Sequence, residues 1–279
     1  MQAQFDAGAE TVDLRAELAH ELPSRVISEL LGVPVADRDR LTELTEAITP
    51  LLNVQMAPED TDRALAASEE FADYARDLID ERRQNPGDDL MTDLIQAEED
   101  DQSLSREELV SLFITLYSAG HRTTRDLFSN GLYELLHRPG DYAAIASDPD
   151  LVPGAVQEFL RYETPTLYVG RVPTEDVEIA GDPVAAETLT LVLLGAANRD
   201  PETYTDPHRF DIYRDEADPL SFAAGRHRCL GAPLATMEAE VMLEAVTQRF
   251  PKLELAEPEP DWWSSGPFRG LDHLRVRPA

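Results

Sequence analysis

The stretch FAAGRHRCLGAPLA, Phe222 to Ala235, decides how this sequence is interpreted, because it carries Cys229, the only cysteine of the chain. Gly225 and Gly231 flank this cysteine, and Pro233 opens a predicted helix. A thiol just before a helix N-terminus feels the positive end of the helix dipole, and the basic side chains between Gly225 and Cys229 add to that field. Two interpretations stay open: a small buried structural residue, or a thiolate that acts as nucleophile or metal ligand.

The kind of chemistry open to Cys229 depends on its possible helpers. A nucleophilic cysteine needs a base held by a third group. His227 and His121 are candidates for that base, but neither lies in a local signature of the cysteine hydrolases. A zinc site needs three or four Cys or His ligands at short spacing, which six histidines and one cysteine do not supply here. A single thiolate suits haem iron, because the porphyrin provides the four equatorial bonds.

The pattern around the cysteine resembles a known family. Phe222-x-x-Gly225-x-His227-x-Cys229-x-Gly231 is similar to the haem-binding loop of the cytochromes P450. The similarity continues through the following APLA, as in the soluble bacterial and archaeal members. This loop pattern is highly specific for the family.

Other motifs follow in the family's order. Glu158-Phe-Leu-Arg161 resembles the ExxR motif of the K helix, and Arg209 resembles the arginine that closes its ion triad. AGHRTT (119–124) resembles the oxygen-activation segment of the long I helix, and AANRDP (196–201) a common bacterial stretch. The resemblance covers nearly the whole chain.

The family implies a role for each matching position. Cys229 would be the axial thiolate ligand of haem b (iron protoporphyrin IX), which favours O–O cleavage. His227 and Arg171 would pair with the haem propionates through charge-assisted hydrogen bonds, and Phe222 would pack beside the sulfur. The cofactor-binding positions implied are Cys229, His227, Arg171, Phe222, Gly225 and Gly120.

The I-helix segment departs from the family at Arg122, where an acid usually precedes the threonine. Thr123 is present, and we expect Thr123 and Arg122 to be the catalytic side chains. An arginine cannot act as a general acid at ordinary pH, because its pKa stays above about 12. Either Arg122 is a tolerated substitution in a slow monooxygenase, or it binds a substrate carboxylate. Peroxide-using haem peroxygenases have an arginine here, but they usually pair it with a proline where this chain has Thr123.

The periodicity predicts a mainly α fold with a minor β-sheet, that is, a P450-like fold. We expect a single domain over residues 1–279, incomplete at the N-terminus, because the family's first quarter or more has no counterpart. The longest predicted helix begins at the capping box Ser105/Glu108 and ends near His137. The other predicted elements are helices over 14–31, 38–52, 62–83, 89–97, 153–162 and 233–249, and strands over 177–179 and 188–194.

The composition constrains the cellular context. The net charge is -31, with 55 acidic residues against 24 basic ones, and Lys252 is the only lysine. Self-repulsion of this size is screened at molar salt, where the Debye length falls to about 3 Å, so we expect a halophilic protein. An acidic face for a basic partner is the alternative. The charge argues against nucleic acid or an anionic membrane as partner, and the absence of a signal peptide or long apolar run predicts a cytoplasmic protein.

The resemblance implies an oxidoreductase: a haem-thiolate monooxygenase that hydroxylates an apolar small molecule with dioxygen. Its electrons would come from a ferredoxin-type donor. One alternative is a peroxide-using peroxygenase, suggested by Arg122. The other is a non-catalytic truncated remnant or helper subunit of the family. The retained Cys229 argues against a helper that has abandoned haem, but not against a recent fragment.

Overall fold

A computed structural model describes residues 2–54, 56–99, 104–216 and 218–279. The chain divides into two compact units, residues 1–125 and 126–279. Helix α6 (Arg106–Leu136) contributes its first part to unit 1 and its last part to unit 2.

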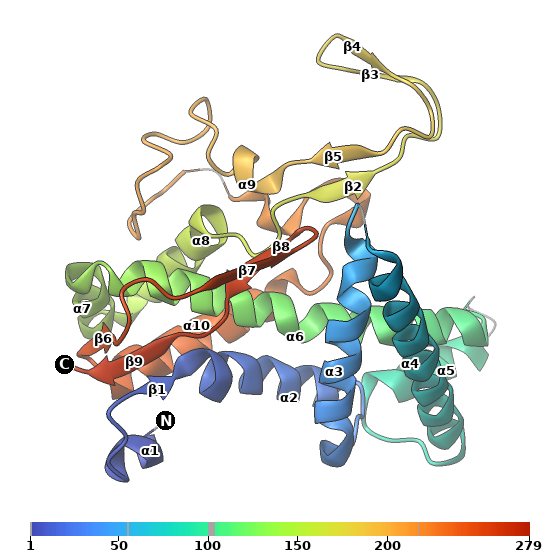
Figure 1. Ribbon diagram of the computed structural model, residues 1–279, viewed down its shortest axis with the longest axis horizontal. Helices are drawn as coiled ribbons and strands as arrows, with labels where there is room; N and C mark the ends of the chain where they lie inside the picture. Colours follow the sequence, from blue (N-terminus) through green and yellow to red (C-terminus); the bar gives the residue numbers. More distant parts are fainter. Residues whose placement is uncertain (1, 55, 100–103, 217) are drawn as a thin grey trace. The chain divides into compact units, whose positions relative to one another are not determined.

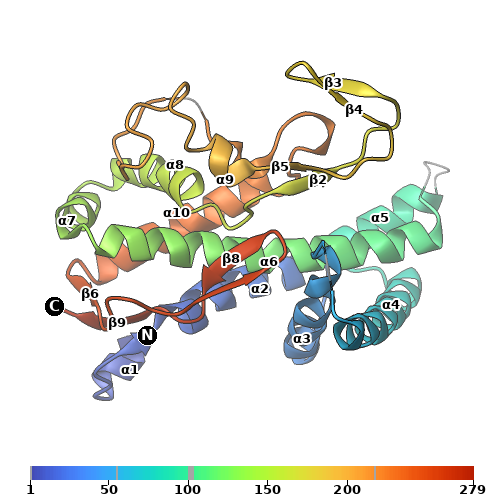
Figure 2. The same cartoon turned by 45° about the horizontal axis from the view of Figure 1, so that its top comes forward.

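Unit 1 is helical, and α3 and α4 lie side by side in both views (Figures 1 and 2). Its core centres on the aromatic side chains Phe71, Phe113 and Tyr117, whose ring centroids lie 6.0 to 6.1 Å apart. Its elements besides α6 are α1 (Gln2–Asp6), β1 (Val12–Asp13), the π-helix η1 (Arg15–His20), α2 (Glu21–Leu30), η2 (Val35–Asp37), α3 (Arg38–Ile48), η3 (Thr49–Leu52), α4 (Pro58–Gln84) and α5 (Leu90–Glu99).

The start of α6 confirms the predicted capping box. The backbone N–H of Ser105 donates to the Glu108 carboxylate at 2.7 Å, and the N–H of Glu108 donates to the Ser105 hydroxyl at 3.3 Å. These reciprocal bonds satisfy donors that the helix leaves unpaired. The helix then runs without a break to Leu136, close to the end predicted near His137.

Unit 2 packs α10 (Ala232–Arg249) against α7 (Pro139–Ser147) and α8 (Val152–Tyr162). The apolar stripe of α8 is buried, and Phe159 on it is fully buried. The remaining helical elements are short: η4 (Pro149–Leu151), α9 (Leu194–Ala197), η5 (Leu220–Phe222) and η6 (Gly225–His227).

The strands of unit 2 form small antiparallel pairs. β2 (Val169–Arg171) pairs with β5 (Thr190–Val192), and the hairpin of β3 (Val177–Ile179) and β4 (Asp182–Val184) extends beyond them (Figures 1 and 2). β6 (Leu253–Leu255) pairs with β9 (Arg275–Pro278), and β7 (Trp262–Ser265) pairs with β8 (Phe268–Leu271). The predicted mainly α fold with minor sheets is confirmed.

Two differences from the sequence prediction have local causes. The helix predicted over 14–31 begins as the π-helix η1 and becomes α-helical only at Glu21. The strand predicted over 188–194 ends at Val192, because the chain turns into α9 at Leu194. Within the described residues, no helix combines the length and hydropathy needed to span a bilayer.

Gly131 gives a test of the packing in unit 2. A Cβ on Gly131 would overlap the ring of Phe159, so the α6 backbone approaches α8 only because this side chain is absent. We expect Gly131→Ala to destabilise the protein by about 1–3 kcal/mol through overpacking. Gly140→Ala is the matched control, because no atom lies within 4 Å of its Cβ position and alanine favours the helix. Urea unfolding of both variants measures the difference, and equal stabilities would contradict the packing described.

Candidate functional site

The cysteine loop of unit 2 holds the thiol in the open. Cys229 is exposed, and its backbone N–H donates to the carbonyl of Phe222 at 2.9 Å, which closes the loop. Gly225 takes a φ of 74°, a left-handed conformation that glycine adopts without a steric penalty. The helix α10 begins at Ala232, so the thiol lies just before a helix N-terminus, as predicted.

The loop fits the haem that the resemblance implies. A Cβ on Gly225 would meet nothing within 4 Å, and one on Gly231 would meet only the Cys229 sulfur at 4.0 Å. Open space beside an exposed thiol is what a planar ligand needs to reach the sulfur. His227 is exposed on η6 and Phe222 is half-buried at the end of η5, both on the same loop as the thiol.

Arg171 lies on β2, in the same unit. Its guanidinium donates to the carbonyl of Gly170 at 2.8 Å. Two backbone hydrogen bonds fix the chain before β2 to β8 and to the turn that precedes β8. The N–H of Leu167 donates to the carbonyl of Pro267 at 2.7 Å, and the N–H of Arg269 donates to the carbonyl of Pro165 at 3.0 Å. Residues 166–170, which lead into β2, are therefore anchored at their start.

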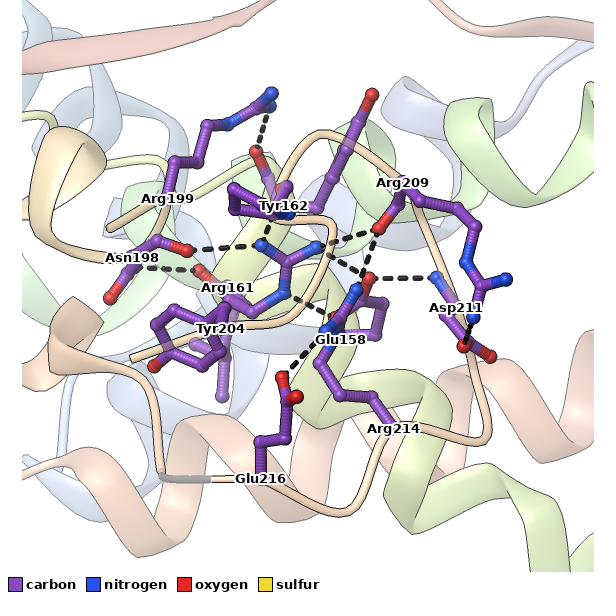
Figure 3. A network of polar contacts seen from close by, with 12 residues as sticks. Glu158, Arg161, Tyr162, Asn198, Arg199, Tyr204, Arg209, Asp211, Arg214 and Glu216 are labelled. Carbon is purple, nitrogen blue, oxygen red and sulfur yellow. Dashed lines mark hydrogen bonds and ion pairs between the residues drawn. The ribbon is translucent and has the colours of Figure 1, made fainter. Parts of the chain in front are cut away.

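A buried ion pair lies on α8 (Figure 3). The Arg161 guanidinium donates to both carboxylate oxygens of Glu158, at 2.6 and 2.7 Å. Both side chains are at most 2% exposed. The remaining donors of Arg161 reach the carbonyls of Asn198, Pro207 and Arg209 at 2.8 to 3.0 Å. The pair thus fixes the path of the irregular chain after α9.

The prediction that the Arg209 side chain closes this network is wrong. That side chain is 63% exposed and pairs with Asp211, while only its backbone carbonyl accepts from Arg161. The second guanidinium near Glu158 belongs to Arg214, at 3.5 Å, with its side chain 9% exposed. The physical reason is the course of the loop: the N–H of Asp211 donates to Glu158 at 2.7 Å, which turns the Arg209 side chain outward and brings Arg214 in (Figure 3).

Asn198 connects this network to the cysteine loop, a role that the sequence did not reveal. Its amide donates to the Ser221 hydroxyl at 2.8 Å, and its oxygen accepts from the N–H of Leu220 at 2.7 Å. The Ser221 hydroxyl in turn donates to the carbonyl of Leu160 on α8 at 2.5 Å. The next residue, Phe222, accepts the backbone N–H of Cys229, so these hydrogen bonds tie the backbone of the cysteine loop to α8. The AANRDP stretch was the only signal in the sequence.

The predicted I-helix residues lie in unit 1. The Thr123 hydroxyl donates to the carbonyl of Ala119 at 3.0 Å, one turn back along α6. The guanidinium of Arg122 donates to the Thr49 hydroxyl at 2.6 Å. A Cβ on Gly120 would lie 2.7 Å from Ile27, so the missing side chain admits α2 at close range.

His121, the alternative base, is buried in unit 1. One ring nitrogen lies 3.0 Å from the carbonyl of Tyr117, and burial lowers the pKa of His121 to about 4. The imidazole is therefore neutral at pH 7. Within the described residues, no cluster of three or more His, Cys, Asp or Glu is arranged to hold a metal ion.

Glu238 on α10 is an unexpected buried carboxyl. It is 4% exposed, and neither of its oxygens has a hydrogen-bond partner among the described residues. Burial raises its pKa to about 7. A carboxyl inside the helical layer of unit 2 therefore keeps its proton at mildly acidic pH.

The raised pKa predicts how stability depends on pH. Below about pH 4.5 the Glu238 carboxyl is protonated in both the folded and the unfolded chain. Between about pH 4.5 and 7 it is protonated only in the folded chain. The free energy of unfolding therefore falls as the pH rises through this window. The full effect is about 3 kcal/mol. We expect Glu238→Gln to flatten this slope and to stabilise the protein at pH 8, measured by urea unfolding at pH 5 and 8. Glu240→Gln, on the same helix, is the control; an unchanged slope in Glu238→Gln would contradict the prediction.

Comparison with known proteins places the chain in a family. A cytochrome P450 family model matches residues 42–152 and 147–262. The 6-deoxyerythronolide B hydroxylase of Saccharopolyspora erythraea is 41% identical over 269 residues, which are 95% of this chain and 65% of that protein. The cytochrome P450 monooxygenase PikC of Streptomyces venezuelae is 42% identical over 95% of this chain and 63% of its own length.

Solved structures of P450 proteins match the fold of this chain. P450BioI, in complex with an acyl carrier protein ligated to hexadec-9Z-enoic acid, matches with a TM-score of 0.93 at 34% identity. That match covers 100% of this chain and 72% of the P450BioI chain. The ligand-free Mycobacterium smegmatis CYP164A2 matches with the same TM-score of 0.93 at 35% identity, over 99% of this chain and 72% of its own.

The chain belongs to the cytochrome P450 family, and these curated relatives come from bacteria. It spans 63% to 66% of the length of the first three curated relatives. The family implies a haem-thiolate cofactor, and the open cysteine loop of unit 2 is compatible with it.

Proposed function

We propose that the protein is a haem-thiolate monooxygenase that hydroxylates an apolar small molecule. The single observation that carries this proposal is the exposed Cys229 thiol, held in a glycine-shaped loop at the start of α10 in a member of the P450 family. Haem b, when bound, would supply the activation of dioxygen. Cys229 would be its axial ligand, and His227 and Arg171 would pair with its propionates.

The protein side chains would orient the cofactor and deliver protons. The network from Glu158 and Arg161 through Asn198 supports the proposal, because it fixes the chain that leads into the cysteine loop. Thr123, whose hydroxyl donates to the carbonyl of Ala119, would hold a proton for this delivery. Arg122 stays cationic and donates to Thr49, so it would position that proton path without acting as an acid.

The substrate class and the electron donor are part of the same proposal. Two relatives are named as a 6-deoxyerythronolide B hydroxylase and a cytochrome P450 monooxygenase, and P450BioI is seen with an acyl carrier protein ligated to hexadec-9Z-enoic acid. We propose a free apolar molecule as substrate and a ferredoxin-type donor. Exposed Arg226 and Arg228 beside the thiol would offer the donor positive charge in a chain of net charge -31. A halophilic cytoplasm as its location also stays a proposal.

Arg122 favours a second candidate, a peroxide-using peroxygenase. The guanidinium is part-buried on α6, where it could bind a substrate carboxylate bidentately. A non-catalytic truncated remnant or helper subunit is the remaining alternative, and absence of haem uptake would favour it.

The experiment that separates these candidates uses the chain in molar salt with haem. Reconstituted protein receives either a ferredoxin, its reductase and NAD(P)H, or hydrogen peroxide, with a panel of fatty acids and macrolactones. We expect hydroxylated product with the electron donor, and a rise of about tenfold in Arg122→Asp, because an acid beside Thr123 supplies protons. Arg122→Gln is the control without an acid. Product only with peroxide would establish the peroxygenase, and the absence of haem uptake would overturn both enzyme candidates.

A further inference from the structure

Ala223, in the cysteine loop of unit 2, has a backbone conformation that alanine rarely takes. Its φ is 53° and its ψ is -167°. This combination lies at the edge of a region that only glycine occupies readily, because the Cβ of an L-residue crowds the backbone there. Ala223 is half-buried and directly follows Phe222, whose carbonyl accepts from Cys229. The loop that carries the thiol therefore contains a strained residue.

The peptide group between Phe222 and Ala223 is held on both of its sides. Its carbonyl accepts the N–H of Cys229 at 2.9 Å, and its N–H donates to the carbonyl of Leu220 at 2.7 Å. From this fixed peptide group the chain continues into Ala224, whose backbone is extended, with φ -143° and ψ 168°. The strain at Ala223 thus accompanies the orientation that places the Phe222 carbonyl on the N–H of Cys229.

Two side chains fix the residues just before Ala223. Asn198 is fully buried; its oxygen accepts from the N–H of Leu220 at 2.7 Å, and its amide donates to the Ser221 hydroxyl at 2.8 Å. That hydroxyl donates to the carbonyl of Leu160 on α8 at 2.5 Å. We call Asn198 and Ser221 the brace. A strained conformation persists only where its surroundings hold it, and the brace supplies the hydrogen bonds that do so.

Ala180 provides a comparison within the same unit. It has the same φ of 53°, and it is followed by Gly181 at φ 93° in the exposed turn between β3 and β4. A two-residue hairpin turn needs positive φ at both of its central residues, so the turn accounts for the conformation of Ala180. Ala223 lies instead between η5 and η6, where its conformation serves the loop that carries the thiol.

We propose that Ala223 and the brace are positioning residues for the Cys229 thiolate. The brace keeps the strained peptide group in place, and the Phe222 carbonyl then holds the backbone of Cys229 and so the direction of its sulfur. The proposal rests on the proposed function, because the direction of the sulfur matters for an iron ligand. Strain and brace act in opposite directions: relief of the strain tightens the loop, and loss of the brace loosens it.

Hydrogen exchange of the Cys229 amide tests this opposition. It is followed by NMR in the full chain without haem, at molar salt. Ser221→Ala should speed exchange about tenfold, because both hydrogen bonds of the hydroxyl are lost. Ala223→Gly should slow it about fivefold, because glycine takes this conformation without the strain. The double variant should exchange at close to the rate of the unaltered chain.

Each variant has a matched control. Ser147→Ala also removes a hydroxyl that donates to a backbone carbonyl, at 2.8 Å, but on α7. Ala180→Gly relieves a φ of the same size in the β3–β4 turn. Neither control should change the exchange of the Cys229 amide. The Arg269 amide, which is hydrogen-bonded outside the cysteine loop, serves as reference, so the ratio of the two rates separates loop opening from unfolding of the unit.

The haem-loaded protein gives a second readout. In the reduced protein with carbon monoxide, Ser221→Ala should move part of the red-shifted Soret band to its normal position, and Ala223→Gly should restore it in the double variant. Faster exchange in Ala223→Gly, an unchanged rate in Ser221→Ala, no rescue in the double variant, or an equal change at the Arg269 amide would overturn the proposal. Haem uptake is recorded separately: its absence would overturn the proposed function, whereas the amide rates alone decide whether strain and brace hold the loop.

Discussion

Replacement of Cys229 by alanine is expected to abolish the strongly red-shifted Soret band of the reduced protein with carbon monoxide. The shift arises from thiolate ligation, and Cys229 is the only cysteine of the chain, so no other thiolate can replace it. The loop itself should survive, because the bond to Phe222 uses the backbone N–H of residue 229 and not its sulfur. The expected loss is complete, in the reconstituted protein at molar salt.

Arg228→Gln is the matched control for that experiment. This exposed side chain lies next to the cysteine and changes the charge of the loop without touching the sulfur. We expect it to keep the red-shifted band. A band of normal position and intensity in Cys229→Ala would show that the thiol is not the ligand.

The second large effect is expected at the buried pair on α8. Glu158→Gln keeps the shape of the side chain but leaves the Arg161 charge, 2% exposed, without its carboxylate. Breaking one partner of a buried pair costs about 3–5 kcal/mol. We therefore expect a loss of that size in the free energy of unfolding, measured in urea at molar salt.

Two arginine variants test the corrected assignment of the network. Arg214→Ala removes a guanidinium that is 9% exposed and lies 3.5 Å from Glu158, and we expect a loss of about 1–3 kcal/mol. Arg209→Ala removes a side chain that is 63% exposed, while the carbonyl that accepts from Arg161 remains. Its cost should stay within about 1 kcal/mol. A larger loss of stability in Arg209→Ala than in Arg214→Ala would show that the Arg209 side chain, and not that of Arg214, belongs to the network.

The parts of this structure that depend on neighbouring residues could be predicted from the sequence. Ser105 and Glu108 lie three positions apart, so their capping box and the helix after it follow from local chemistry. The Glu158–Arg161 pair is local in the same way. The position of Cys229 just before α10 also follows from the glycines and Pro233 around it, whereas its exposure did not.

Contacts set by the path of loops could not be predicted. Which arginine, Arg209 or Arg214, lies beside Glu158 depends on where residues 206–214 turn. Asp206 in that loop takes a φ of 48°, a conformation that the periodicity of the sequence does not predict. Asn198 reaches Leu220 across a loop of the same kind. Glu238 lies on α10, whose polar and apolar residues do not separate cleanly into two faces. Its burial therefore follows from the packing of α7 and α8 against α10 and not from the sequence pattern.

The carbon monoxide difference spectrum of the unaltered chain tests the central claim most directly. The chain is loaded with haem in molar salt, reduced with dithionite and exposed to carbon monoxide. We predict one haem per chain and a strongly red-shifted Soret band, as thiolate ligation by Cys229 requires. Absence of haem uptake, or a band at the position given by histidine ligation, would contradict the assignment of Cys229 as the iron ligand.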